Sequence, residues 1–385
     1  MKFKLTITLI SALLYLVSCN KKNSFENENT SSGKRIAVCD IKYAQGFKIE
    51  YFTNFKLLTI IDPWQGAEKV QFRYALSNNI DSLIDLPEDI IRIKTPIEKV
   101  VCLSTTHIAF IDALNKNSTV KGISGHNYVC NPIVRESIEK KEVFDVGYDN
   151  SLNYELIASI NPDLVTTYGI GSQVAAYNQR MNELGVQTVI IAEYLENHPL
   201  GKLEWIKFVA AFYNMDEYAN NYFNNIEKQY TELLQVTKGV YNKPSVLFGL
   251  PWKEVWYVPG GNSYLAKMVE DAGGDYIWNE NNSKESLTFN FESIFSKATN
   301  AEIWLNTGSI NSKDEILGID ERFSKFKPFQ NAKIYNNNAR VNAFGGIDYW
   351  ESGIVNPHII LKDMIFILHP ELIPDYKLVY YKEIN

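Results

Sequence analysis

A long amphipathic helix near the middle of the chain is the feature that most restricts how this sequence can fold. Apolar side chains recur over residues 216–237 at steps of four, three, four and three, the spacing of one helical face: Ala219, Phe223, Ile226, Tyr230 and Leu233. Asp216 is expected to cap this helix, because its carboxylate can accept the free N–H groups of the first turn. At a rise of 1.5 Å per residue, the helix would span about 33 Å, the width of a small domain.

A short motif occurs once on each side of this helix. Residues 153–157 and 290–294 both read Asn-aromatic-Glu-x-Ile, and each motif is followed by a buried-strand pattern that ends in glycine. A repeat that flanks one long helix predicts two α/β lobes joined by a rigid connection. The alternative is that two ordinary βα loops share an Asn cap and a first-turn Glu by coincidence.

The first residues read as a targeting signal followed by a tether. Residues 1–18 combine two lysines with an apolar stretch that is too short to span a membrane as a helix. The sequence Leu-Val-Ser-Cys at 16–19 resembles the bacterial lipobox, in which cleavage precedes the cysteine, here Cys19, and lipid is attached to its sulfur. A cysteine that follows an ordinary signal by chance is the alternative. Residues 19–34 are polar and read as a flexible tether.

Composition narrows the class of protein. A chain of 385 residues with 45% hydrophobic content can bury a large core and is expected to form two domains. Its formal net charge of −7 argues against nucleic acid as a partner. Without a lipidated Cys19, three cysteines remain, and this odd number predicts no disulfide framework: Cys39, Cys102 and Cys130.

Strand and helix patterns divide the remainder of the chain. Residues 35–96 read as short strands that form an extra sheet on the first lobe. Strands and helices alternate over 97–200 and again over 241–376, and linking helices occupy 201–240. The expected fold class is therefore α/β, with two lobes of mostly parallel sheet joined by one long helix and preceded by a β extension.

The candidate binding cleft lies beyond the carboxyl ends of the strands, where parallel α/β sheets bind ligands. Most side chains expected there are aromatic, which suits a large, flat or amphipathic small molecule. The alternative for each ring is that it packs the lobes, and Trp64 lies either at the cleft rim or over the first lobe. The candidates are Trp64, Thr106, His107, Tyr128, Tyr168, Trp252, Trp256, Tyr257 and Arg340.

Motifs of catalysis and metal binding are not found in the sequence. There is no G-x-S-x-G elbow and no phosphate loop, and residues 169–174 lack the third glycine of a dinucleotide fingerprint. The five histidines show no ligand spacing, so no metal site of the protein's own is predicted. We therefore expect a binding protein without catalytic residues or a cofactor. An enzyme on a two-lobed scaffold and a direct metal-ion binder are the alternatives.

Several stretches together resemble the helical-backbone substrate-binding proteins of bacterial ABC importers, which handle ferric siderophores, haem and cobalamin. The matching stretches are residues 99–107, 153–165, 183–186, 271–275, 348–351 and 361–372. The resemblance implies a monomer, lipid-anchored on the periplasmic side of a bacterial membrane, that delivers a small-molecule metal chelate to an ABC permease and its ATPase. A helix between the lobes also implies that they move only slightly on binding.

The resemblance gives the repeated motif a role. In the family, one surface glutamate on each lobe docks into arginines of the permease, and the matching positions are Glu155 and Glu292. The alternative is that both residues only favour their helix dipoles, by about 0.3–1 kcal/mol each. The ligand stays open among a ferric siderophore, cobalamin and haem, in which His107 or Tyr257 would ligate the metal. Scattered arginines favour cobalamin, haem or a neutral iron chelate over an anionic catecholate.

Overall fold

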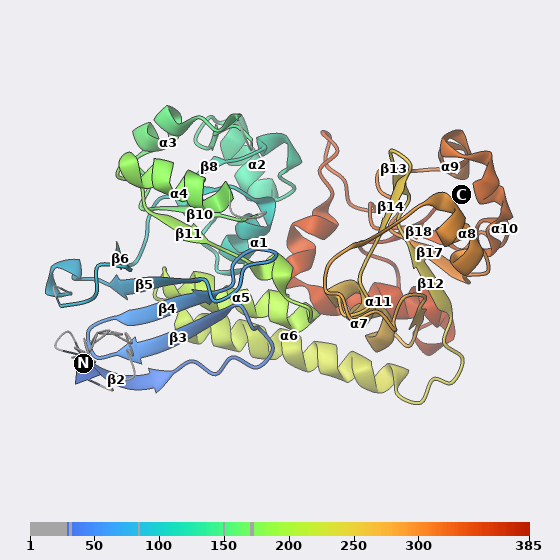
Figure 1. The fold of residues 1–385 in the computed structure, drawn as a ribbon, viewed down its shortest axis with the longest axis horizontal. Helices are drawn as coiled ribbons and strands as arrows, with labels where there is room; N and C mark the ends of the chain where they lie inside the picture. The colour runs from blue at the N-terminus through green and yellow to red at the C-terminus, as the bar shows by residue number, and fades with distance from the viewer. Residues whose placement is uncertain (1–28, 31–32, 84, 149–150, 170–172) are drawn as a thin grey trace, which may run out of the picture.

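The long helix forms where the sequence predicts it, as α6 (Asp216–Thr237), and runs along one side of both lobes (Figure 1). The predicted apolar face is buried at Ala219, Phe223, Ile226 and Tyr230, whereas Leu233 is only partly buried. The computed structural model describes residues 29–30, 33–83, 85–148, 151–169 and 173–385, so the expected signal and Cys19 lie outside it. Within these ranges, no helix is long and apolar enough to cross a membrane.

Both ends of α6 are tied to other parts of the molecule. The expected capping role of Asp216 is wrong: the N-cap is Met215, and the Asp216 carboxylate instead accepts from Tyr51 Oη at 3.1 Å and pairs with the Lys56 ammonium. At the other end, Tyr230 Oη donates to Asp271 Oδ2 at 2.7 Å. The helix therefore connects the N-terminal sheet to the second lobe through buried and half-buried polar contacts.

The first lobe is a five-stranded parallel sheet in the order β11-β10-β7-β8-β9. Its strands are β7 (Val100–Cys102), β8 (Val120–Ile123), β9 (Phe144–Asp145), β10 (Leu164–Thr167) and β11 (Thr188–Ile190). Its helices are α1 (Thr105–Ala113), α2 (Pro132–Glu139), α3 (Tyr154–Ile160) and α4 (Gln173–Glu183), with the short helices η2 (Asn117–Thr119), η3 (His126–Tyr128) and η5 (Glu193–Leu195). Helix α5 (Pro199–Ala211) follows and is buried along its whole length.

The second lobe repeats this arrangement, with one strand reversed. Its main sheet has the order β15-β12-β17-β18-β19, and only β19 runs antiparallel to its neighbour. The strands are β12 (Ser245–Phe248), β15 (Asp275–Tyr276), β17 (Ile303–Leu305), β18 (Ile334–Asn336) and β19 (Lys382–Glu383). A small antiparallel sheet that the sequence did not predict joins β13 (Pro251–Trp252), β14 (Val255–Val258) and β16 (Leu287–Phe289).

Helices surround the sheets of the second lobe (Figure 1). They are α7 (Tyr264–Asp271), α8 (Phe291–Ala298), α9 (Lys313–Ile319), α10 (Lys327–Gln330) and α11 (Pro357–Leu368). Short helices connect them: η6 (Glu321–Lys325), η7 (Asp348–Trp350), η8 (Ser352–Val355) and η9 (Pro370–Leu372). The two lobes, the connecting helix and the parallel sheets confirm the predicted fold class.

The N-terminal extension forms a sheet, as expected; it has six strands and packs against α5. Its strands are β1 (Asn29–Thr30), β2 (Gly33–Val38), β3 (Phe47–Phe52), β4 (Lys56–Ile61), β5 (Gln71–Ser77) and β6 (Ile90–Lys94), with η1 (Ile80–Ser82) between the last two. All pairs are antiparallel except β5 and β6. The Phe47 ring lies 4.9 Å from Trp205 and 5.5 Å from Phe208, centre to centre, so aromatic packing joins the sheet to the helix.

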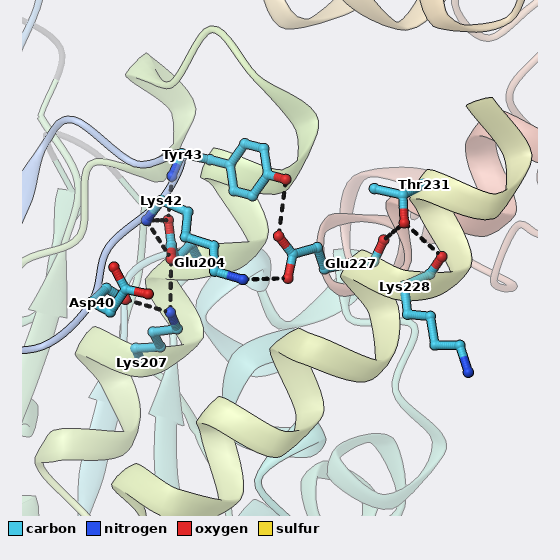
Figure 2. Close-up of polar contacts among 8 residues, drawn as sticks. All are labelled: Asp40, Lys42, Tyr43, Glu204, Lys207, Glu227, Lys228 and Thr231. Carbon is cyan, nitrogen blue, oxygen red and sulfur yellow. Dashed lines mark hydrogen bonds and ion pairs between the residues drawn. The ribbon is translucent and has the colours of Figure 1, made fainter. Parts of the chain in front are cut away.

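The segment before β3 is bonded to both helices that link the lobes (Figure 2). The buried Glu204 carboxylate on α5 accepts the backbone N–H groups of residues 42–44 at 3.0, 2.8 and 2.9 Å, and it pairs with Lys207 at 2.8 Å. Lys42 Nζ and Tyr43 Oη both donate to Glu227 on α6, at 2.7 and 2.9 Å. The extension is therefore part of the same framework as the connecting helix.

Candidate functional site

A cavity of about 390 Å³ lies between the two lobes, a volume within the usual range of small-molecule sites. The first lobe and α5 supply one wall, and the second lobe supplies the other. The lining residues are Ser104, Thr105, Thr106, Glu193, Tyr194, Pro199 and Lys202 on one side and Tyr264, Met268, Tyr349, Trp350, Gly353, Ile354, Pro357 and Ile360 on the other.

The first wall is built where strands of the parallel sheet end. Strand β7 runs into α1, where Ser104 is the N-cap and its Oγ accepts the Thr106 N–H at 3.3 Å. Strand β11 is followed by η5, which places Glu193 and Tyr194 beside that helix start in the cavity wall. The cavity thus lies at the carboxyl ends of the strands, as expected for a sheet of this kind.

This wall contains two buried side chains of opposite charge, Glu193 and Lys202, which attract each other electrostatically. Glu193 is 3% exposed, and burial raises the pKa of its carboxyl, an effect opposed by the Lys202 ammonium and the Thr106 hydroxyl. Lys202 is 8% exposed, and burial lowers the pKa of its ammonium, against the attraction of Glu193 and Glu196. Lys202 Nζ also lies 4.2 Å from the centre of the Tyr264 ring in the second lobe, a cation–π contact between the lobes.

A second cavity of about 370 Å³ adjoins the first and shares Tyr194 and Tyr264 with it. The N-terminal extension supplies part of its wall through Asp62, Trp64, Gln65 and Gly66. The Trp64 ring also packs edge-on against Phe72 of β5, at 6.1 Å between centres. Trp64 therefore both borders a cavity and packs against its own sheet.

Most of the other predicted cleft residues lie outside both cavities. Thr106 lines the first cavity, and Trp64 lines the second. Arg340 pairs with Asp348 at 2.9 Å on the surface, and Tyr168 packs against an apolar cluster of the first lobe. The remaining aromatic candidates are exposed and line neither of these two cavities: Tyr128, Trp252 and Tyr257.

Two predicted cleft residues belong to the core instead, and the expectation for them is wrong. His107 is fully buried, its Nδ1 lies 2.8 Å from Thr166 Oγ1, and burial lowers the pKa of the imidazole to about 3, so the ring is neutral. Trp256 is also fully buried, and its Nε1 donates to the Phe248 carbonyl at 2.9 Å. Neither ring is accessible to a ligand, so His107 is not placed to ligate a haem iron.

The repeated motif has the same local geometry in both lobes. Asn153 caps α3 by accepting the Leu156 N–H, and Asn290 caps α8 by accepting the N–H of residue 293, both at 2.9 Å. Glu155 and Glu292 each occupy the second position of their helix and are exposed. Arg322 Nη1 lies 3.5 Å from the Glu292 carboxylate. The two motifs are therefore equivalent structures, one on each lobe.

A contact between the lobes that the sequence did not predict is centred on Glu351. This carboxylate, at the end of η7, is 3% exposed and accepts the backbone N–H groups of Cys130 and Asn131 in the first lobe at 2.8 and 2.7 Å. Asn342 Nδ2 donates to the first-lobe carbonyls of Asn127 and Val129 at 2.8 Å each. We call these contacts of Glu351 and Asn342 the interlobe latch.

The latch contains a group that titrates near neutral pH. Burial raises the pKa of the Glu351 carboxyl to about 7, and the nearby carboxylates of Asp348 and Asp112 act in the same direction, whereas the two N–H donors oppose it. Glu351 stands in the stretch 348–351 that carries part of the family resemblance, but nothing in that stretch indicates a partner in the other lobe. Among the described residues, no group of three or more His, Cys, Asp or Glu side chains is arranged to hold a metal ion.

Comparison with known proteins agrees with this architecture. Two uncharacterised lipoproteins of Methanocaldococcus jannaschii match almost the whole chain. One is 28% identical over 393 residues, covering 96% of this chain and 91% of the relative. The other is 25% identical over 406 residues, covering 100% of this chain and 99% of the relative.

Solved structures share the fold. A possible iron-binding periplasmic solute-binding protein of Staphylococcus epidermidis aligns with a TM-score of 0.55 and 18% identity, covering 71% of this chain and 99% of that one. The periplasmic haem-binding protein HutB of Vibrio cholerae aligns with a TM-score of 0.52 and 17% identity, covering 68% and 98%. The model of the periplasmic binding protein family matches residues 100–340. This chain therefore belongs to the periplasmic binding protein family, a family of binding proteins rather than enzymes.

Proposed function

We propose that this protein is the lipid-anchored substrate-binding component of an ABC importer and captures a metal chelate between its lobes. The observation that carries the proposal is the cavity of about 390 Å³, whose walls come from two lobes joined by one long helix. Lipoprotein relatives that span nearly the whole chain support attachment through Cys19 on the periplasmic side of a membrane.

The side chains that line the cavity support a chelate as the ligand. Its lining is mainly aromatic and aliphatic, including Tyr264, Tyr349 and Trp350, which suits a bulky ligand with apolar faces. Solved proteins of the same fold include one described as haem-binding and one as possibly iron-binding. The ligand in this proposal is a ferric siderophore, cobalamin or haem.

Ligand capture is tested by tryptophan fluorescence, because Trp350 lines the cavity. The full chain in mild detergent is titrated with a ferric siderophore, cyanocobalamin and haem, with free tryptophan and empty micelles as blanks. Saturable quenching by one chelate is expected, and Trp350→Phe should lose much of the quenching while calorimetry still reports binding. Absence of a heat of binding for every chelate would contradict the proposal.

Glu155 and Glu292 dock the loaded protein to the permease in this proposal. Each is an exposed carboxylate held at a helix start by an Asn cap, one per lobe, so together they present two charges at a separation set by the closed lobes. Arginines of the permease would pair with them, and its ATPase would then drive transport.

The docking role is tested by charge reversal. Glu155→Lys with Glu292→Lys should abolish chelate uptake by cells and leave the dissociation constant of the chelate unchanged. Glu280→Lys, at another exposed glutamate, is the matched control and should transport normally. Uptake that survives the double reversal would rule out docking through these residues.

A further inference from the structure

Three buried glutamates lie close together in sequence, and two of them are fully engaged by protein donors. Glu196 accepts the backbone N–H groups of Gln45 and Gly46 at 2.9 Å each and the Trp205 indole N–H at 3.0 Å. Glu204 accepts three backbone N–H groups and the Lys207 ammonium. These two carboxylates have structural partners from the N-terminal extension and α5.

The third glutamate, Glu193, is different. It is as buried as Glu196 and lines the interlobe cavity, where the Lys202 ammonium and the Thr106 hydroxyl act on its carboxylate, yet its Oε2 has no hydrogen-bond partner within the described residues. A buried carboxylate oxygen without a donor costs free energy, so such a group usually has a function or an unseen partner. A ligand donor in the cavity would supply that partner.

Lys202 is likewise a buried charged group whose hydrogen-bonding capacity is not used by the described residues, but it is a cation and a donor. Its ammonium packs over the Tyr264 ring and makes no ion pair within 4.0 Å among the described residues, unlike Lys207, which pairs with Glu204 one turn further along α5. Its three N–H groups are therefore available to an acceptor in the cavity. Glu193 and Lys202 thus offer one acceptor and one donor in the same wall.

The charge of the lining restricts the ligand. Among the described residues that line the cavity, Glu193 is the only acid and Lys202 the only base, and none is an arginine. A polyanionic ligand would bury several negative charges against one lysine and one carboxylate, which is unfavourable in a low-dielectric site. A neutral group that carries a donor beside an acceptor matches the pair without leaving a charge unpaired.

We propose that the ligand is a charge-neutral chelate whose amide N–H groups donate to Glu193 and whose amide or hydroxamate oxygens accept from Lys202. This inference rests on the proposed function and specifies its ligand class. It favours a neutral ferric trihydroxamate or an amide-bearing corrinoid and disfavours a ferric tricatecholate or haem, whose carboxylates are anionic. Glu193 and Lys202 then determine specificity, because together they favour a neutral chelate over an anionic one.

The test measures dissociation constants by calorimetry for the full chain in mild detergent. The probes are a neutral ferric trihydroxamate, cyanocobalamin, a ferric tricatecholate and haem. Wild-type protein should bind at least one neutral probe at least tenfold more tightly than both anionic probes. Glu193→Gln should weaken the preferred neutral probe by tenfold or more and strengthen the anionic probes, and Lys202→Met should weaken the neutral probe as well.

Glu204→Gln is the matched control, because this residue is as buried as Glu193 but touches neither cavity. It should lower the melting temperature and leave the ratio between probes unchanged. Tighter binding of an anionic probe by the wild type, or an unchanged neutral affinity in a folded Glu193→Gln variant, would overturn this inference while the proposed function stands. No binding of any probe would overturn the proposed function and this inference with it.

Discussion

Replacing Glu351 with glutamine should remove part of the pH dependence of the unfolding free energy, the part that comes from the interlobe latch. In the folded protein the Glu351 carboxyl has a pKa of about 7, because burial in the interlobe latch disfavours its charged form, against an ordinary value of 4.5. The folded state therefore keeps this proton at pH values where the unfolded chain has lost it. The stabilising contribution is fully present below pH 4.5 and is lost as the pH rises through 7.

The magnitude follows from the two pKa values. At 1.36 kcal/mol per pKa unit the whole effect is about 3 kcal/mol, of which about 2.5 kcal/mol falls between pH 5 and pH 8. The glutamine side chain does not titrate, so Glu351→Gln should lack this part of the pH dependence. The variant's unfolding free energy should also be about 1–3 kcal/mol lower than that of the wild type at low pH. The glutamine N–H₂ group cannot accept a hydrogen bond, so one of the two backbone N–H donors loses its acceptor.

Urea unfolding followed by tryptophan fluorescence at pH 5, 6, 7 and 8 measures this difference. The wild type should lose about 2.5 kcal/mol more unfolding free energy than the Glu351→Gln variant from pH 5 to pH 8. Glu280→Gln, at an exposed acid, is the control and should follow the wild type. Equal pH dependence in wild type and Glu351→Gln would refute the argument.

Three further predictions concern packing. Glu204→Gln should lower the unfolding free energy by about 3–5 kcal/mol in urea titrations, because Lys207 stays buried without its counter-charge. Trp256→Ala should cost about 3–5 kcal/mol by the same assay and leave chelate affinity within twofold, and a selective loss of affinity would contradict its place in the core. Gly346→Ala would put a Cβ atom 2.4 Å from the Tyr128 carbonyl oxygen of the other lobe, so small-angle scattering should report more separated lobes; an unchanged scattering curve would count against the latch.

The fold was predictable because its main signals are local. The apolar spacing in α6 depends only on helix geometry, and the alternation of strands and helices expected over 97–200 is found in the first lobe. The capping role of Asp216 failed because that prediction considers only its own helix. The carboxylate instead has partners more than 150 residues away in the chain, namely Tyr51 and Lys56.

The site was predictable only in part, because exposure depends on contacts between distant segments. The place of Thr106 after a strand predicts a position in the cavity wall, whereas the prediction for Trp256 fails because it does not include the small antiparallel sheet. The alternation in Val255–Val258 is a signal that was available, since it places Trp256 inside and leaves Tyr257 46% exposed. Lys202 lies on a helix that is buried all round, so no amphipathic pattern indicates which of its faces meets a cavity.

Residues 42–46 of the N-terminal extension donate to two buried carboxylates, Glu196 and Glu204. The family model begins at residue 100, yet Glu196 and Glu204, which lie inside the matched region, obtain most of their donors from residues outside it. Deleting the extension would leave Glu204 with Lys207 and Glu196 with the Trp205 indole, and it would remove the five backbone N–H groups that now bond to these two carboxylates. The extra sheet is therefore not a detachable addition, because its removal would leave two buried carboxylates short of hydrogen-bond donors inside the lobes.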